Sequence, residues 1–316
     1  MHVNLKNRHF LTLMDYAEEE ILYLLDLARD LKEKKKKGIY GNHLKGKNIA
    51  LIFEKPSTRT RCAFVVACND EGAYPEYLGK NDIQLGHKES VEDTARVLGR
   101  MFDGIEYRGF SQKALETLAK YSGVPVWNGL TDADHPTQVL ADFLTMQEYL
   151  GKLKGLKLVF VGDGRNNMSN ALMIGAAKVG IHYVIAAPGA LHPDEALLNA
   201  CRGIAAQSGG SIDIMEDPLK AVQNAHVVYT DVWVSMGEED KKEERIGLLQ
   251  PYQVNRQLIS ATGRKDTLLL HCLPAVKGYE VTEDVFEAHA AEIFDEAENR
   301  LHTIKAVMVA TLGDLA

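Results

Sequence analysis

Residues 156–189 read LKLVFVGDGRNNMSNALMIGAAKVGIHYVIAAPG and contain the pattern that decides the fold class. A run of apolar, strand-forming residues ends in the glycines 162 and 164, a helical pattern starts near residue 167, and a second apolar run begins at Ile181. Strands that are apolar on both faces and alternate with helices are typical of parallel sheets covered on both sides. The stretch therefore predicts a β-α-β unit of a doubly wound sheet.

The same pattern recurs on both sides of this unit. Further strands are predicted at 47–53, 104–109, 124–129, 226–234 and 267–274, and further helices at 17–38, 55–72, 135–153 and 297–313. A chain of 316 residues, at about 150 residues per domain, predicts two domains. We expect an α/β protein with two doubly wound parallel-sheet domains, 1–150 and 151–294, and a C-terminal helix in 295–316 that crosses back to the first domain.

The composition argues against several classes of protein. The formal net charge is −8, so neither nucleic acid nor an anionic membrane surface is an expected partner. No run of about 18 apolar residues could span a bilayer, and the first residues lack an apolar signal core. The four cysteines show no CxxC pair and no zinc-ligand spacing, which favours a cytoplasmic location. The basic run 34–37 is interpreted as a solvated helix end.

The segments richest in reactive side chains all follow predicted strands. They are STRTR (57–61), YRG (107–109), HPTQ (135–138), GDGRNN (162–167), DVWVSMG (231–237) and HCLP (271–274). Ligands of open parallel sheets bind beyond the carboxyl ends of the strands. These segments are therefore the candidate binding sites.

Ser57, Thr58, Arg59 and Thr60 lie where a strand gives way to a helix. Hydroxyl groups, guanidinium donors and the unpaired N–H groups of a helix start together suit a phosphate. The alternative is that the hydroxyls only cap the helix. Arg59 and Arg61 are two residues apart and point to different faces, so we assign Arg59 to the ligand and Arg61 to an ion pair.

Two further segments could complete this site. Arg108, at another strand end, would add a second guanidinium, and a surface salt bridge is the alternative. His135 and Gln138 stand three apart at a helix start and therefore share one face. A neutral imidazole and an amide could hydrogen bond a small planar group such as a carbamoyl. The alternative is that His135 only begins the helix.

The glycine pair 162 and 164 does not indicate a dinucleotide site. The G-x-G-x-x-G pattern needs a glycine at 167, where Asn167 stands, and the next strand ends in Ala187 and Pro188 without a ribose-binding carboxylate. Asn167 instead offers a neutral donor and acceptor at the start of a helix. An NAD-dependent oxidoreductase is therefore not expected.

Asp231, His271 and Cys272 end two other strands. A carboxylate at a strand end could hold an ammonium group, so Asp231 is a candidate amine-binding residue. Adjacent strand residues point to opposite faces, so His271 and Cys272 are not expected to form a nucleophilic dyad with each other. A single cysteine in a buried strand is usually inert packing.

Taken together, these segments resemble the aspartate/ornithine carbamoyltransferase superfamily over nearly the whole chain. FEKPSTRTR, DIQLGHKES, YRGF, HPTQ, DVWVSMG, HCLP and ENRLHTIKAVM occur in the family's order. The resemblance implies one domain for carbamoyl phosphate and one for an amino acid, with no metal or organic cofactor. The motif DVWVSMG resembles that of the ornithine-using members, whereas members that use aspartate or putrescine are expected to lack SMG.

The resemblance also implies a role for each matching residue. The residues expected to hold carbamoyl phosphate are Ser57, Thr58, Arg59, Thr60, Gln84 from a neighbouring subunit of a trimer, Arg108, His135, Gln138, Cys272, the carbonyl of Leu273, and Arg300. Those expected to hold ornithine are Asn167, Asp231, Ser235 and Met236. The segment between Pro274 and Val281 is shorter than in some relatives, which bears on loop closure and on assembly beyond the trimer.

We expect direct attack of a neutral δ-amine on the carbamoyl carbon, with Arg108 and His135 polarising the carbonyl. A free amine of this kind has a pKa of about 10.4, and a carboxylate beside it would stabilise the charged form. Asp231 is therefore assigned to the α-ammonium group, and Cys272 to the proton of the δ-amine. One alternative is a different acceptor, putrescine or an acylated ornithine. Another is a binding subunit without catalytic activity. The sequence leaves open whether the reaction runs in the biosynthetic or the catabolic direction.

Overall fold

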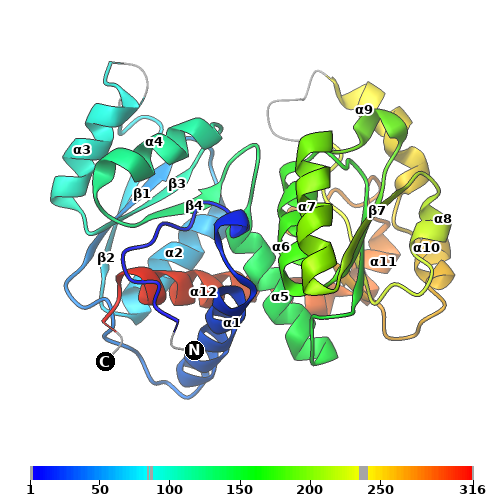
Figure 1. Ribbon diagram of the computed structural model, residues 1–316, viewed down its shortest axis with the longest axis horizontal. Coiled ribbons are helices and arrows are strands. Elements are labelled where there is room, and N and C mark those ends of the chain that lie inside the picture. Colours follow the sequence, from blue (N-terminus) through cyan, green and yellow to red (C-terminus); the bar gives the residue numbers. More distant parts are fainter. Residues whose placement is uncertain (1–2, 84, 86–87, 235–240, 315–316) are drawn as a thin grey trace. The chain divides into compact units, whose positions relative to one another are not determined.

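The computed structural model describes residues 3–314 except 84, 86–87 and 235–240 (Figure 1). The chain divides into two compact units, which are described separately: unit 1 comprises 1–144 and 298–316, and unit 2 comprises 145–297. Each unit contains one sheet, and all strand pairs within both sheets are parallel. The predicted fold class, two parallel-sheet α/β domains, is confirmed.

Unit 1 is built on a four-stranded sheet with the strand order β2-β1-β3-β4. Its strands are β1 (Asn48–Phe53), β2 (Tyr74–Gly79), β3 (Gly104–Arg108) and β4 (Val126–Leu130). Its helices are α1 (Glu18–Lys36), α2 (Thr58–Asp70), α3 (Val91–Met101), α4 (Gln112–Ser122), the first part of α5 (Pro136–Leu150) and the end of α12 (Ala290–Leu312).

The two faces of this sheet bury different side chains. Alternate residues such as Ile52 of β1 and Tyr107 of β3 pack in one apolar cluster with Leu115 of α4. Figure 1 shows α3 and α4 on one face of the sheet and α2 and α12 on the other. Because side chains alternate along a strand, Glu106 and Arg108 of β3 point to the face opposite Tyr107.

Polar contacts fix the C-terminal half of α12 in unit 1. The Lys305 ammonium lies 2.6 Å from a carboxylate oxygen of Asp70 on α2. The Lys32 ammonium of α1 donates to the Asn299 side-chain oxygen at 2.7 Å. Both lysines are almost fully buried, so these partners satisfy charges that would otherwise be costly to bury. The expected return of the last helix to the first domain is confirmed.

Unit 2 is built on a five-stranded sheet with the strand order β7-β6-β5-β8-β9. Its strands are β5 (Lys157–Val161), β6 (His182–Ala186), β7 (Ser211–Met215), β8 (Val227–Tyr229) and β9 (Leu268–Leu270). Its complete helices are α6 (Asn167–Val179), α7 (Glu195–Ser208), α8 (Pro218–Ala221), α9 (Lys242–Leu249), α10 (Arg256–Ala261) and α11 (Glu283–Ala288).

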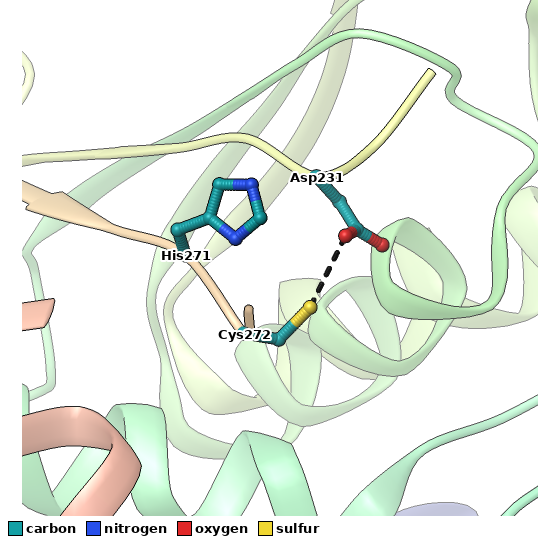
Figure 2. Close-up of side chains that lie close together, drawn as sticks. All are labelled: Asp231, His271 and Cys272. Carbon is teal, nitrogen blue, oxygen red and sulfur yellow. Dashed lines mark hydrogen bonds between the residues drawn. The ribbon is translucent and has the colours of Figure 1, made fainter. Parts of the chain in front are cut away.

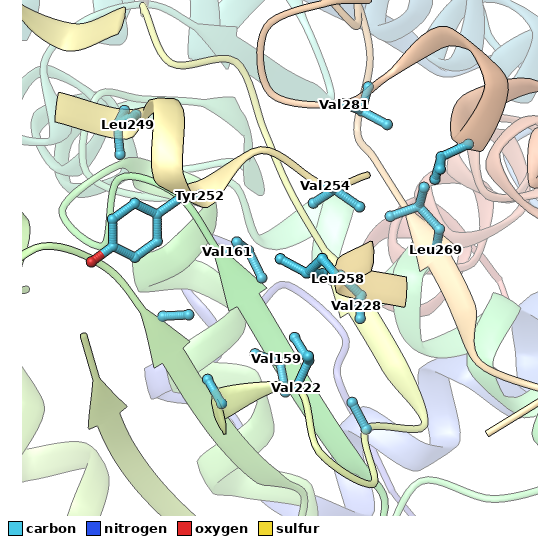
Figure 3. Packing of buried hydrophobic residues seen from close by; sticks show 14 of the residues in the cluster. Val159, Val161, Val222, Val228, Leu249, Tyr252, Val254, Leu258, Leu269 and Val281 are labelled. Atoms are coloured by element: carbon cyan, nitrogen blue, oxygen red, sulfur yellow. The ribbon is translucent and has the colours of Figure 1, made fainter. Parts of the chain in front are cut away.

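The core of unit 2 explains why its central strands are apolar on both faces. Val159 and Val161 of β5 pack with Val228 of β8 and Leu258 of α10 in one cluster of buried side chains (Figure 3). In Figure 1, α6 and α7 cover the opposite face of the sheet. The β5-α6-β6 unit predicted from residues 156–189 is present, and α6 ends at Gly180, whose φ of 72° lies in the left-handed region.

Two strands, β2 and β7, have no counterpart among the predicted elements, and each lies at the edge of its sheet.

Among the helices of the described residues, none combines the length and the hydropathy that a bilayer span requires.

Candidate active site

The candidate residues of unit 1 gather where β1, β3 and β4 end. All three strands are parallel, so their carboxyl ends lie at one edge of the sheet, and α2 and α5 begin in the connections that follow β1 and β4. Ser57 is the N-cap of α2, where its hydroxyl accepts a hydrogen bond from the Thr60 N–H at 3.2 Å. Ser57 therefore caps the helix, which neither excludes nor tests a ligand contact, and Thr58 is exposed in the first turn.

Thr60 is the point on which two guanidinium groups converge. Its buried hydroxyl oxygen accepts from Nη1 of Arg108 at 3.4 Å and from Nη2 of Arg300 at 3.2 Å. Arg108 ends β3 and Arg300 comes from α12, so residues 192 positions apart in the chain meet here. Two buried guanidiniums beside a helix start form a strongly anion-attracting environment.

Gln138 links this pair to α5. Its side-chain oxygen accepts from Nη1 of Arg300 at 2.8 Å, and its amide donates to Asp142 at 2.9 Å. Both polar atoms of Gln138 are therefore engaged by the protein, and the side chain orients Arg300. Asp142 was not among the predicted site residues, although it lies one turn after Gln138 on the same helix face.

His135 is buried beside the same guanidinium groups. Burial, followed by the charges of Arg300, Arg108 and Arg59, holds the pKa of this imidazole well below its usual range. His135 is therefore neutral near pH 7 and can donate only one ring hydrogen. The charge of Arg59 therefore also acts on His135. The Arg61 guanidinium instead lies 3.8 Å from the centre of the Tyr77 ring.

The lowered pKa of His135 leads to a direct prediction. We expect its imidazole carbon signals in nuclear magnetic resonance spectra to show no titration at the pH of an ordinary histidine, about 6.5. A His135→Gln variant assigns the signal. A His135 midpoint near the ordinary histidine value of about 6.5 would contradict the neutral assignment.

Asp134, immediately before His135, is also buried. Burial raises the pKa of this carboxyl to about 7, against hydrogen bonds from Thr12 and from the His135 N–H that lower it. The native state therefore holds a proton that the unfolded chain releases near pH 4. Stability from this group is complete below that pH and is lost as the pH rises through about 7.

Replacing Asp134 by Asn removes this proton linkage. We expect the variant to be more stable than the wild type at pH 8 by about 2 kcal/mol, because an amide recovers part of the hydrogen bonding without a buried charge. Urea unfolding at pH 8 and at pH 5 measures the difference. The difference in stability between the variant and the wild type should be smaller at pH 5. A difference that does not change with pH would contradict the linkage.

In unit 2, an acid and a thiol lie side by side at the ends of β8 and β9 (Figure 2). The Cys272 thiol donates to Oδ1 of Asp231 at 3.1 Å. The side-chain amide of Asn166 donates to Oδ2 of Asp231 at 3.1 Å. Burial raises the pKa of Asp231, while His271 and Cys272 lower it. The carboxylate therefore has a partner on each oxygen and an increased proton affinity.

The expectation that His271 and Cys272 form no dyad rested on the alternation of side chains along a strand, and that reason does not apply at these positions. Strand β9 ends at Leu270, so the alternation of faces no longer applies, and ligand atoms of Asp231, His271 and Cys272 all lie within 4.8 Å of one another. Nδ1 of His271 accepts from the Leu273 N–H at 2.9 Å, which leaves Nε2 as the donor toward Glu280 at 3.2 Å. The three clustered residues could also supply nitrogen, sulfur and oxygen ligands to a transition metal.

The structure describes only some of the other predicted residues of unit 2. Asn167 is the first residue of α6 and is half-buried, whereas its neighbour Asn166 is the one seen to contact Asp231. Leu273 has a φ of 60°, an uncommon conformation for this residue type. Ser235 and Met236 of unit 2, and Gln84 of unit 1, lie outside the described residues.

The segment after residues 235–240 is fixed to the loop that follows β5. Arg245 of α9 and Asp163 form an ion pair of 2.8 Å in which both side chains are more than nine-tenths buried. This pair orders the described residues on the C-terminal side of the DVWVSMG motif. In the sequence, Asp163 stands between the glycines 162 and 164, and no partner was predicted for it.

Two parallel-sheet units, one with converging guanidiniums and one with an acid–thiol pair, define an enzyme of the α/β class whose sites lie at strand ends. Residues 8–148 match the family described as aspartate/ornithine carbamoyltransferase, carbamoyl-P binding domain. Residues 154–311 match its Asp/Orn binding domain. The chain therefore belongs to the aspartate/ornithine carbamoyltransferase family, as its motifs predict.

Individual relatives match over almost their whole length. An ornithine carbamoyltransferase of Pseudothermotoga lettingae is 60% identical, with 99% of this chain and 100% of the relative covered. A catabolic ornithine carbamoyltransferase of Bacillus licheniformis is 59% identical, with 99% and 98% covered. The solved structure of ornithine carbamoyltransferase from Pyrococcus furiosus aligns with a TM-score of 0.94 at 46% identity, covering 98% of this chain and 99% of the other.

Proposed function

We propose that this protein transfers the carbamoyl group of carbamoyl phosphate to the δ-amine of L-ornithine, giving L-citrulline and phosphate. The observation that carries the proposal is the convergence of Arg108 and Arg300 on Thr60 beside the neutral His135. Paired guanidiniums suit a phosphate, and a neutral imidazole suits the carbonyl next to it. The full-length match to both domains of the family supports the same assignment.

Carbamoyl phosphate is assigned to the residues of unit 1 and to the HCLP segment. The phosphate is held by Ser57, Thr58, Arg59, Thr60 and Arg108, and the carbamoyl group by His135, Gln138, Arg300, Cys272 and the Leu273 carbonyl. Because His135 is neutral, it has one ring N–H, which it donates to the carbonyl oxygen. Ornithine is assigned to Asn167, Asp231, Ser235 and Met236, and Asn166 joins this set through Asp231.

The reaction begins with loss of a proton from the δ-ammonium group, whose pKa is about 10.4 by analogy with lysine. The Cys272 sulfur accepts this proton while the thiol hydrogen passes along its hydrogen bond to Oδ1 of Asp231. The raised pKa of Asp231 favours this transfer. Oδ2 of Asp231 holds the α-ammonium group.

The neutral amine then adds to the carbamoyl carbon and forms the new C–N bond. Negative charge develops on the carbonyl oxygen, where His135 and Arg108 stabilise it. The tetrahedral intermediate collapses as the bond from carbon to the phosphate oxygen breaks. Phosphate leaves with that electron pair and takes up the second amine proton. No covalent enzyme intermediate is formed, so a trapped carbamoyl-cysteine would contradict the scheme.

The test is phosphate release from carbamoyl phosphate with one amine at a time: ornithine, putrescine, N-acetylornithine and aspartate. We expect turnover with ornithine, citrulline as the product, and the other amines slower by about 10³-fold or more, because unmatched polar groups of the site are left unpaired. Preference for another amine would keep the donor site and overturn the ornithine assignment. No turnover with any amine would favour a non-catalytic binding subunit.

We further propose a homotrimer in which Gln84 completes the donor site of a neighbouring subunit. Two variants, Gln84→Ala and Arg59→Met, should each be inactive alone. Co-assembled in equal amounts, they should regain activity at about one quarter of the sites, because random mixing pairs an intact Arg59 with an intact Gln84 that often. Light scattering gives the mass of the assembly. If a mixed trimer regained no activity, the shared site would be overturned.

The four free cysteines favour a cytoplasmic location.

A further inference from the structure

Glu106 of β3 is a buried acid that the proposed mechanism does not use. It is completely inaccessible to solvent, and neither carboxylate oxygen has a hydrogen-bond partner among the described residues. Buried polar groups are usually hydrogen bonded, and an unpaired buried charge costs several kcal/mol. An acid in this position therefore needs a physical explanation.

The backbone around Glu106 makes room for its carboxyl group. At Gly129 on β4, an added Cβ atom would lie 1.9 Å from Oε1 of Glu106. Gly129 is also the residue at which the register between β3 and β4 shifts, since Tyr107 pairs with Asn128 and Arg108 with Leu130. The carboxyl group occupies space that only a glycine at this irregularity leaves open.

Glu106 lies next to the two guanidiniums of the donor site. It is two residues before Arg108 on the same strand, so both side chains point to the face covered by α2 and α12. Burial raises the pKa of Glu106 well above its usual value, while the charges of Arg108 and Arg300 lower it. These opposing effects leave a carboxyl whose proton depends on the charge bound at the guanidiniums.

Two other titratable groups, Cys68 and His135, share the surroundings of Glu106. Burial, and secondarily Glu106 itself, raise the pKa of the Cys68 thiol on α2 to about 12. The sheet neighbours in register with Glu106 are Leu51 on β1 and Trp127 on β4, which carry no charge. His135, which shares the field of Arg108 and Arg300, has its pKa lowered rather than raised.

We propose that Glu106 is a positioning residue for the anionic donor: it takes up a proton when a dianion binds to Arg108 and Arg300. An ionised Glu106 would offset part of the charge that holds the phosphate, and the neutral acid leaves that charge to the ligand. Binding of the dianion and protonation of Glu106 are therefore linked, and each strengthens the other. This inference rests on the proposed phosphate site.

Sulfate is the probe, because it stays a dianion throughout the pH range of the experiment. Its inhibition constant against carbamoyl phosphate is measured from pH 6.5 to pH 9 in wild type and in Glu106→Gln. In wild type the affinity should fall by about tenfold as the pH rises, since a carboxylate forms near the guanidiniums. The Gln variant should keep the affinity that the wild type has at low pH across the whole range.

Calorimetry in buffers of different ionisation enthalpy adds a direct count of protons. Sulfate binding to wild type should take up a fraction of a proton per site, and binding to Glu106→Gln or Glu106→Met should take up none. The Met variant covers the case in which the Gln variant does not fold. Asp134→Asn is the matched control, because it removes a different buried acid of unit 1 with a pKa raised to about 7.

The outcomes separate this inference from the proposed function. A pH dependence that persists in both Glu106 variants, or that disappears in Asp134→Asn instead, would overturn the role of Glu106 and leave the phosphate site intact. Absence of sulfate binding at every pH, together with absence of turnover, would remove the phosphate site and this inference with it. A role of Glu106 in packing alone would change stability without changing the slope of affinity against pH.

Discussion

Asp231→Asn is expected to lower kcat/KM for ornithine by about 10⁴-fold, because it removes both the proposed partner of the α-ammonium group and the proposed final acceptor of the proton relay. The amide cannot take the proton that the Cys272 thiol passes along its 3.1 Å hydrogen bond. Affinity for the anionic donor should change little, since the residues proposed to hold its phosphate belong to unit 1. Steady-state kinetics with each substrate varied in turn measure both effects.

A double-mutant cycle tests whether Cys272 and Asp231 act together. Cys272→Ser should cost about 10²-fold in kcat, and the double variant should be no slower than Asp231→Asn, because the first loss already breaks the relay. Cys62→Ser, at an exposed position of α2, is the control and should keep wild-type activity. Fully additive losses, or full activity of Cys272→Ser at every pH, would refute the relay.

Arg108→Met is expected to lower kcat/KM for carbamoyl phosphate by about 10³-fold, because one guanidinium is proposed to serve both the phosphate and the developing oxyanion. Methionine keeps most of the apolar stem, so the loss reports on charge and donors rather than on packing. The variant should also bind sulfate more weakly, which separates the phosphate contact from any effect on the amine.

Arg29→Met is the matched control for this variant. Arg29 is exposed on α1, where its guanidinium lies 2.8 Å from Asp26, and surface ion pairs of this kind contribute little. Its kinetics should equal those of the wild type within about twofold, and thermal unfolding should show both variants folded. If Arg108→Met bound carbamoyl phosphate as tightly as this control, the proposed donor site would be wrong.

Local patterns were sufficient to predict the central strands and two of the helices that follow them, α2 and α6, whereas α4 and α7 were not predicted. Residues 156–189 combine an apolar run, a glycine turn and a helix with a suitable N-cap and C-terminal glycine, and the structure has β5, α6 and β6 in those positions. Central strands of parallel sheets are apolar on both faces, so their sequence signal is strong. The reactive segments were located by the ends of these strands, so their positions could be predicted from the same apolar pattern.

Two of the four edge strands, β2 and β7, could not be predicted in this way. β2 contains Pro75 and is partly exposed, and β7 alternates between buried Ile212 and exposed Asp213. Each has a neighbour on one side only, so neither needs a continuous apolar run, and proline is tolerated at a sheet edge. Their pairing depends on the strand beside them rather than on their own composition.

The sequence by itself determined the fold class and the family, and it supplied the candidate site residues, because periodicity and motifs are local properties of the chain. Only the tertiary structure decided which of them meet: Arg300 with Thr60, Asn166 with Asp231, and the Cys272 thiol with the same carboxylate. Burial and neighbouring charge set the proton affinities of Asp231 and Glu106. Both quantities depend on the atoms that surround a group in space, and no spacing along the chain encodes them.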